Sequence, residues 1–304
     1  MRLVDRARAG DTRAIARLLS LVESGSPTLR RISADLMRHV SGSHVIGITG
    51  SPGVGKSTMT SALIEAYRAQ DKRVAVIAVD PSSPFSGGAL LGDRVRMNAH
   101  ATDPGVFIRS MAARGHLGGL SAAAPQALRV LDACGFDVVL VETVGVGQSE
   151  VEVVGQTDTV LVLLVPGMGD GVQVAKAGIL EIADVFVVNK ADRDGVAHTT
   201  RELRAMLALG PPGDDDWLPP IVTTVATRSE GIGDVVAAID RHREWASSSG
   251  GLRQRRLRRI QREIEALASD MVRGRLGNAS DLAERVLVGE MDPYLAAQLL
   301  TDSL

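Results

Sequence analysis

Residues 50–57 read Gly-Ser-Pro-Gly-Val-Gly-Lys-Ser and fit the pattern G-x-x-x-x-G-K-[ST] of a phosphate-binding loop. An apolar run that predicts a buried strand comes before this loop, and a segment with helical spacing of its apolar residues follows it. Glycines let successive backbone N–H groups point into one concavity, and the helix N-terminus adds partial positive charge there. We expect Lys56 to reach the β- and γ-phosphates of a nucleotide and Ser57 to bind Mg²⁺. The predicted nucleotide contacts of this loop are Gly50, Ser51, Pro52, Gly53, Val54, Gly55, Lys56, Ser57 and Thr58.

Two aspartates flank the loop that follows a second apolar run, residues 74–79. Asp80 ends the run, and Asp93 lies beyond the glycine- and proline-rich loop. Either carboxylate could hold Mg²⁺ or its waters near the phosphates. The alternative is an Asp-Pro turn at Asp80 and a solvated side chain at Asp93. We favour the metal-binding interpretation for Asp80 because strand ends are where such sheets bind ligands.

An acidic residue also ends the apolar run 138–141, where Glu142 is followed three residues later by Gly145. In nucleotide hydrolases this arrangement is a switch, in which the acid holds a metal-bound water and the glycine N–H contacts the γ-phosphate. The usual acid there is aspartate, so the longer Glu142 would act through a water. Gln148 lies near the place where a water-positioning glutamine could sit, although its offset differs from that of small Ras-like GTPases.

The sequence Asn189-Lys190-Ala191-Asp192 fits N-K-x-D and follows the apolar run 185–188. A carboxylate at Asp192 can accept hydrogen bonds from guanine N1–H and the 2-amino group, whereas adenine would leave it unpaired. Because an unpaired buried polar group costs roughly 1–3 kcal/mol, the motif predicts guanine selectivity. The aliphatic stem of Lys190 can lie on the base. A backbone N–H near Ala226 could contact guanine O6, or that segment is an ordinary strand-to-helix turn.

Seven short apolar runs alternate with helical segments and must position these residues. Such alternation predicts an α/β fold with a mostly parallel central sheet flanked by helices, here a P-loop NTPase. Because ligands of such sheets bind at the carboxyl ends of the strands, the residues after each run become candidates for the site. The runs are residues 45–49, 74–79, 106–109, 138–141, 160–165, 185–188 and 221–225.

The composition narrows the classes of protein to consider. The chain has 304 residues, of which 45% are hydrophobic and 23% charged, an ordinary globular mixture. Its formal charge of −2 gives no general attraction to nucleic acid or to anionic lipid. Cys134 is its single cysteine, which excludes a disulfide framework and favours a reducing cytoplasm. We expect no signal peptide and no membrane span, because apolar runs are short.

Three regions are expected along the chain. Residues 1–42 form an N-terminal helical extension in which Asp11 caps a helix, and residues 43–248 form the nucleotide-binding domain. Residues 249–304 follow a Ser/Gly-rich linker and form a helical arm. Apolar residues repeat at 3,4 spacing there, which favours an arm that clasps a second subunit. A helix folded back on its own domain, or a basic nucleic-acid-binding face, are the alternatives. The repeat consists of Leu257, Ile260, Ile264, Leu267 and Met271.

With these residues in view, the chain resembles the MeaB/ArgK/MMAA family of P-loop GTPases over nearly its full length. The marks of the resemblance are residues 50–57, 79–84, 109–120, 142–150 and 189–192. Members of this family are homodimeric chaperones of adenosylcobalamin-dependent mutases, typically methylmalonyl-CoA mutase. They use GTP to gate cofactor loading and the removal of damaged cofactor. An older label calls them kinases or ATPases of lysine/arginine/ornithine transport.

The resemblance supports some roles that the residue patterns indicate and adds others. It implies that Ser57, Asp80, Asp93 and Glu142 surround Mg²⁺ and that, with Lys56, the three acids take part in hydrolysis. It also implies a further switch in the loop after residue 165, which relays the nucleotide state to the mutase. The implied relay consists of Arg96, Gln148, Asp170, Gln173 and Lys176. A dimer-forming C-terminal arm is likewise implied.

The predicted function is therefore a cytoplasmic, homodimeric GTPase that binds GTP or GDP with Mg²⁺. As a chaperone it would serve an adenosylcobalamin-dependent mutase, with methylmalonyl-CoA mutase as the expected partner. No nucleic acid or membrane partner is expected. The alternatives are an ATPase or kinase of lysine/arginine/ornithine transport, which the N-K-x-D motif argues against, and a GTPase that serves another partner.

Overall fold

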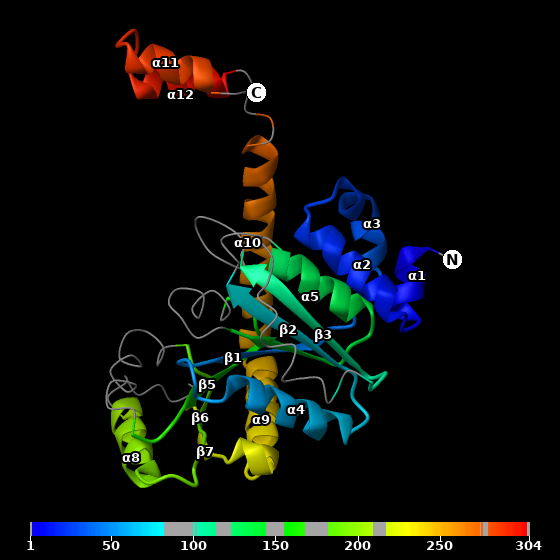
Figure 1. The fold of residues 1–304 in the computed structure, drawn as a ribbon, viewed down its shortest axis with the longest axis vertical. Coiled ribbons are helices and arrows are strands. Elements are labelled where there is room, and N and C mark those ends of the chain that lie inside the picture. Colours follow the sequence, from blue (N-terminus) through cyan, green and yellow to red (C-terminus); the bar gives the residue numbers. More distant parts are fainter. Residues whose placement is uncertain are drawn as a thin grey trace. The chain divides into compact units, whose positions relative to one another are not determined.

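The computed structural model describes residues 2–81, 100, 102–113, 123–143, 155–167, 182–208, 217–273, 275 and 279–302. Within these residues seven strands form one sheet in the order β3-β2-β4-β1-β5-β6-β7, and all neighbouring strands are parallel (Figure 1). All seven predicted runs form strands, which confirms the α/β prediction. The strands are β1 (His44–Thr49), β2 (Val74–Pro81), β3 (Val106–Ala113), β4 (Val138–Glu142), β5 (Thr159–Leu164), β6 (Val185–Val188) and β7 (Ile221–Thr223).

Helices cover both faces of the sheet. Alternate residues of a strand point to opposite faces, so Ile46 and Ile48 of β1 pack on one side and Val45 on the other. The first side holds α4 and α9, and the second holds α5. The described helices of residues 1–259 are α1 (Leu3–Arg8), α2 (Thr12–Glu23), α3 (Pro27–Met37), α4 (Lys56–Arg68), α5 (Ala123–Ala133), α8 (Val196–Leu207), the 3-10 helix η3 (Ala226–Arg228), α9 (Ile232–Ser248) and the start of α10 (Gly251–Arg273).

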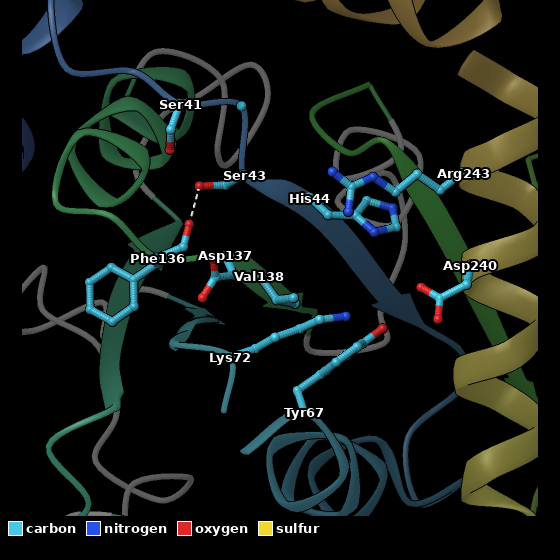
Figure 2. Close-up of a pocket in the computed structure, with 11 residues that line it drawn as sticks. Ser41, Ser43, His44, Tyr67, Lys72, Phe136, Asp137, Val138, Asp240 and Arg243 are labelled. Atoms are coloured by element: carbon cyan, nitrogen blue, oxygen red, sulfur yellow. Dashed lines mark hydrogen bonds between the residues drawn. The ribbon is translucent and has the colours of Figure 1, made fainter. Parts of the chain in front are cut away.

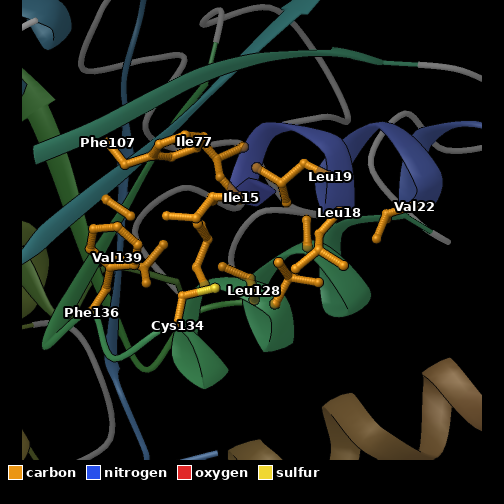
Figure 3. Packing of buried hydrophobic residues seen from close by; sticks show 14 of the residues in the cluster. Ile15, Leu18, Leu19, Val22, Ile77, Phe107, Leu128, Cys134, Phe136 and Val139 are labelled. Atoms are coloured by element: carbon orange, nitrogen blue, oxygen red, sulfur yellow. The ribbon is translucent and has the colours of Figure 1, made fainter. Parts of the chain in front are cut away.

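The N-terminal helices join the core on the α5 side. Asp11 caps α2 as predicted, since its carboxylate accepts hydrogen bonds from the N–H groups of Arg13 and Ala14. Figure 3 shows Ile15 and Leu18 of α2 packed with Leu128 of α5 in one buried cluster, which also contains strand residues. In α3, Leu36 is buried in the same cluster, whereas Met37 is 52% exposed.

The Ser/Gly segment before α10 differs from the prediction of a linker. Its first two serines, residues 247 and 248, are the last turn of α9, and α10 begins at Gly251. Arg255 then forms two hydrogen bonds, of 2.6 and 2.7 Å, with the carboxylate of Asp184. Arg256 pairs with Asp158 at 2.8 Å, and this aspartate is 1% exposed. Breaking such a buried pair costs about 3–5 kcal/mol, so these contacts hold the start of α10 firmly.

Residues 260–304 form a second compact unit, which contains the rest of α10 with α11 (Ser280–Leu287) and α12 (Pro293–Thr301). Asp292 caps α12 by accepting hydrogen bonds from the N–H groups of Tyr294 and Leu295. None of the helices that the structure describes is long and apolar enough to cross a membrane.

A chain of buried polar groups crosses the amino-terminal ends of the central strands. His44 Nε2 lies 2.9 Å from Thr159 Oγ1, which lies 2.8 Å from His242 Nδ1. His242 Nε2 in turn lies 3.1 Å from Asp184 Oδ1. Burial lowers the pKa of His44 from 6.5 to about 3, while Asp158 acts in the opposite direction. The His44 ring is therefore neutral in the folded protein near neutral pH.

This buried histidine predicts a loss of stability in mild acid. Because the unfolded chain binds a proton near pH 6.5 and the folded chain does not until about pH 3, stability falls as the pH drops through this window. The expected slope is up to about 1.4 kcal/mol per pH unit. Urea unfolding between pH 7 and pH 4 measures it, and His44→Gln should flatten the slope. His198→Gln, at an exposed histidine of α8, is the control, and an unchanged slope in His44→Gln would refute the assignment.

Candidate nucleotide site

The phosphate-binding loop joins the carboxyl end of β1 to α4, as the pattern predicts. Gly50 has a φ of 140°, and a Cβ at this position would lie 2.4 Å from the backbone oxygen of Leu163. Gly55 has a φ of 97°, and a Cβ there would lie 2.6 Å from Asn189 Nδ2. Both positions therefore require glycine for two reasons, the backbone conformation and the close approach of Leu163 in β5 or of Asn189, which follows β6.

Lys56 begins α4 and its side chain turns back over the loop. Its ammonium donates hydrogen bonds to the carbonyl oxygens of Gly50, at 2.7 Å, and Ser51, at 3.2 Å. The side chain is buried, with 7% exposed. These contacts hold the positive charge at the rim of the loop, where an anion bound by the loop's N–H groups would meet it. The observed position of the Lys56 ammonium therefore agrees with the expected role in binding phosphate.

Glu142 faces the first turn of α4 from the end of β4. Ser57 Oγ donates a hydrogen bond to Glu142 Oε1 at 2.6 Å, and Thr60 Oγ1 lies 2.8 Å from Oε2. Glu142 is 3% exposed, so its carboxylate is held by hydroxyl donors inside the protein. The structure therefore brings together two of the predicted metal ligands, Ser57 and Glu142. Thr60 was missed, although its spacing of three residues from Ser57 places both hydroxyls on one face of the helix.

Asn189 ties three loops together at the carboxyl edge of the sheet. Its Nδ2 donates to the Val54 carbonyl at 2.9 Å, inside the phosphate-binding loop. Its Oδ1 accepts from Thr224 Oγ1 at 3.1 Å and from the Ala226 N–H at 3.2 Å. Lys190 adds a second link, because its ammonium donates to the Gly53 carbonyl at 2.7 Å. The N-K-x-D segment and the phosphate-binding loop thus form one connected surface.

Asp192 lies on this surface with its side chain exposed. Its carboxylate has no hydrogen-bond or ion-pair partner within the described part of the chain, which leaves both oxygens available as acceptors for a base. The Ala226 N–H, expected to contact guanine O6, instead donates to Asn189 Oδ1 here. A base contact at this N–H stays a prediction and would require it to share its hydrogen between the two acceptors.

Several predicted site residues cannot be placed. Asp80 is the next-to-last residue of β2, and its backbone lies at the same edge of the sheet as Ser57 and Glu142, while its side chain lies outside what the structure describes. The other predicted ligands and relay residues in this group all lie outside the described residues. They are Asp93, Arg96, Gly145, Gln148, Asp170, Gln173 and Lys176.

Comparison with known proteins identifies the family. The family model described as methylmalonyl Co-A mutase-associated GTPase MeaB matches residues 15–281. The chain belongs to the MeaB family. This confirms the resemblance that the motifs indicate, and it places the phosphate-binding loop and the N-K-x-D segment within a family of GTPases.

Comparison with individual proteins supports the assignment of this chain to the MeaB family. A Pyrococcus abyssi protein named as a GTPase is 48% identical over 308 residues, covering 98% of this chain and 94% of that protein. The GTPase ArgK of Escherichia coli is 39% identical over 258 residues, covering 83% of this chain and 78% of ArgK. The mitochondrial methylmalonic aciduria type A homolog of Caenorhabditis elegans is 32% identical over 317 residues, covering 96% of this chain and 79% of that protein.

A solved structure confirms the fold of this MeaB family member. The crystal structure of LAO/AO transport system kinase superposes with a TM-score of 0.73 at 28% identity. The match covers 99% of this chain and 95% of that protein. The α/β P-loop architecture is therefore shared along the whole chain.

Proposed function

We propose that this chain binds GTP at the carboxyl edge of its sheet, hydrolyses it to GDP and phosphate, and uses the cycle as a chaperone. Its client would be an adenosylcobalamin-dependent mutase, with methylmalonyl-CoA mutase as the first candidate. The observation that carries the nucleotide part is the pair of links from Asn189 to Val54 and from Lys190 to Gly53, at 2.9 and 2.7 Å. These links connect the phosphate-binding loop to the N-K-x-D segment and support a single site that spans both.

The residues of the loop would act on the triphosphate mainly by position and charge. Backbone N–H groups of residues 50–57, except that of Pro52, which has none, bind the phosphate oxygens. Lys56 exchanges its two carbonyl acceptors for anionic oxygens, which form stronger hydrogen bonds. Asp192 accepts from the guanine edge and fixes the far end of the nucleotide. Holding both ends orients the γ-phosphate for attack by water.

The oxygen donors at the start of α4 fit a magnesium ion. Ser57 Oγ and Glu142 Oε1 lie 2.6 Å apart, and hydroxyl and carboxylate oxygens are ligands that Mg²⁺ prefers. We assign Ser57 as a direct ligand and Glu142 as a partner that acts through a water, with Asp80 and Asp93 as further acids. When bound, the ion would neutralise charge on the β- and γ-phosphates.

Glu142→Gln tests this assignment. The amide keeps the size of the side chain but removes the negative charge, so the Mg²⁺ concentration needed for half-maximal GTP hydrolysis should rise on the order of 10- to 100-fold. A Mg²⁺ titration of phosphate release measures it. Glu202→Gln, in α8, is the control, and an unshifted titration curve for Glu142→Gln would exclude its role.

An apolar stripe on α10 supports a homodimer. Five residues at 3,4 spacing are between 39% and 60% exposed, which leaves a coiled-coil type of surface for a second copy to cover. Light scattering should give twice the mass of the chain, and Ile264→Asp should reduce it to that of one chain. A wild-type monomer would contradict this part of the proposal. The stripe consists of Leu257, Ile260, Ile264, Leu267 and Met271.

The chaperone part is tested with purified methylmalonyl-CoA mutase. GTP hydrolysis by the chain alone should be slow, because no arginine finger is evident in the sequence, and the mutase should raise the rate of phosphate release. A cobalamin-independent mutase serves as the control. If the mutase neither binds the chain nor changes its rate, the client is a different protein, while binding of GTP itself would still stand.

Transport kinase activity is the competing proposal, supported by the similarity of the fold to LAO/AO transport system kinase. It requires transfer of phosphate from ATP to a protein acceptor. The Asp192 carboxylate disfavours ATP, because adenine N1 is an acceptor and would face it without a hydrogen. Incubation with radiolabelled ATP and with GTP separates the two proposals, since only a kinase leaves label on protein.

A further inference from the structure

A cavity of about 260 Å³ lies at the opposite edge of the sheet from the nucleotide site. Its walls come from the amino-terminal ends of β1 and β4, from the end of α4 and the turn after it, and from α9 (Figure 2). The six residues of β1 separate it from the phosphate-binding loop, a length of roughly 20 Å. We call this space the basal cavity, defined by His44, Tyr67, Lys72, Asp240 and Arg243.

The hydroxyl of Tyr67 reaches the basal cavity from inside the protein. The side chain is 1% exposed, and its hydroxyl has no hydrogen-bond partner among the described residues. Burial raises the pKa of this phenol, with Asp240 adding to the effect, so the group stays a neutral O–H donor. A buried donor without a partner is unfavourable, and native proteins keep few of them. A ligand in the cavity would supply the missing acceptor.

Two cations line the same space. Lys72 Nζ lies 5.0 Å from the centre of the Tyr67 ring, and Figure 2 shows its ammonium and the Tyr67 hydroxyl turned toward one region. Arg243 extends from α9 on another side of the cavity and is exposed. Neither cation forms a hydrogen bond or ion pair with the rest of the described chain. One O–H donor and two cations are a suitable set for an anionic group.

An acceptor completes the lining. Asp240, one turn before Arg243 on α9, is partly buried and also lacks a hydrogen-bond or ion-pair partner in the described residues. His44 contributes no charge, because its ring is neutral and its Nε2 bonds to Thr159. Asp137 also lines the cavity, but its Oδ2 already accepts a hydrogen bond from the Arg73 N–H at 2.7 Å. The cavity thus offers two cations and, in Asp240, one carboxylate without a partner in the described residues, which matches a ligand that carries an acid together with a donor.

We propose that the basal cavity is a second ligand site, which binds a small molecule bearing one carboxylate or phosphate group and one amine or hydroxyl. Lys72, Arg243 and the Tyr67 hydroxyl hold the anionic group, and Asp240 accepts from the amine or hydroxyl. The cavity shares no residue with the nucleotide edge, so we expect its ligand to bind whether or not a nucleotide is present.

Titration calorimetry on the full chain tests this, with Mg²⁺ and excess GDP present to occupy the phosphate-binding loop. Phosphoethanolamine and β-alanine are the probes with both groups, one for each type of acid. Ethyl phosphate and propionate are the matched probes that lack the amine. Phosphoethanolamine or β-alanine, or both, should bind at millimolar concentration. Each one that binds should do so more tightly than the matched probe without the amine. Absence of heat from all four probes would overturn the proposal.

Variants locate the binding. Arg243→Gln should weaken the binding probe about tenfold, whereas Arg241→Gln, an exposed arginine two residues away on α9, should not change it. Tyr67→Phe should raise the melting temperature of the ligand-free protein, because a buried O–H without a partner is removed. The same substitution should lower the affinity for the probe. Equal binding by Arg243→Gln and wild type would show that the probe binds elsewhere and would refute the site.

Discussion

Replacing Lys56 with alanine is expected to abolish GTP hydrolysis and to weaken triphosphate binding. The ammonium is the buried cation that the loop's own carbonyls hold at its rim, at 2.7 Å from Gly50 O and 3.2 Å from Ser51 O. Removing one such charge-stabilising donor lowers kcat by on the order of 10²- to 10³-fold in enzymes generally. Phosphate release and titration with a non-hydrolysable GTP analogue measure the two effects separately.

Two measurements keep this result interpretable. The melting temperature of Lys56→Ala shows whether the variant folds, because the change also leaves two carbonyl groups without their donor. Arg201→Ala, at an exposed position of α8, is the control for loss of a surface cation. Wild-type hydrolysis by a folded Lys56→Ala protein would refute the assignment of residues 50–57 as the phosphate site.

Asp192→Asn is expected to change the preferred base from guanine to xanthine. In the proposed site the carboxylate would accept two hydrogen bonds from guanine, whereas an amide could donate one to the 2-oxo group of xanthine. Because the variant loses a contact with GTP and gains one with XTP, the ratio of the two affinities should change roughly 100-fold or more. Competition between GTP and XTP for a fluorescent guanine nucleotide measures the ratio.

Asp194 provides a matched control for this substitution. It is exposed and lies two residues further along the same turn, so Asp194→Asn removes an equal charge close to the site. A general electrostatic effect would weaken all triphosphates equally in both variants. Base reading changes the selectivity in Asp192→Asn alone, and unchanged selectivity there would remove Asp192 from the site.

Much of the fold and of the nucleotide edge follows from the sequence. The apolar runs are short and rich in Val, Leu and Ile, and helical segments separate them, so a parallel sheet covered on both faces is the arrangement that buries them. Because the strands are parallel, the carboxyl ends of all of them lie at the same edge of the sheet. This is why Lys56, Glu142 and Asn189, far apart in the chain, are found together there.

The partners of these residues required the tertiary structure. Asn189 was expected to belong to a base-reading motif, yet its side chain bonds to Val54, 135 residues earlier, and to Ala226, 37 residues later. Thr60 binds Glu142 across a separation of 82 residues. Such contacts depend on which strands are neighbours, and the spacing of apolar residues does not determine the order of strands in a sheet.

The start of α10 also separates what the sequence predicts from what only the tertiary structure decides. Its apolar repeat is visible in the sequence and favours a dimer arm, with a helix folded back on its own domain or a nucleic-acid-binding face as the alternatives. The structure places Arg255 and Arg256 against Asp184 and Asp158, which are buried at the amino-terminal ends of β6 and β5. The sequence by itself determined the elements, their type and the chemistry at the strand ends, because these depend on local periodicity and on residue type. Only the tertiary structure decided which charges are paired inside the protein, because that pairing depends on which strand ends face the helix.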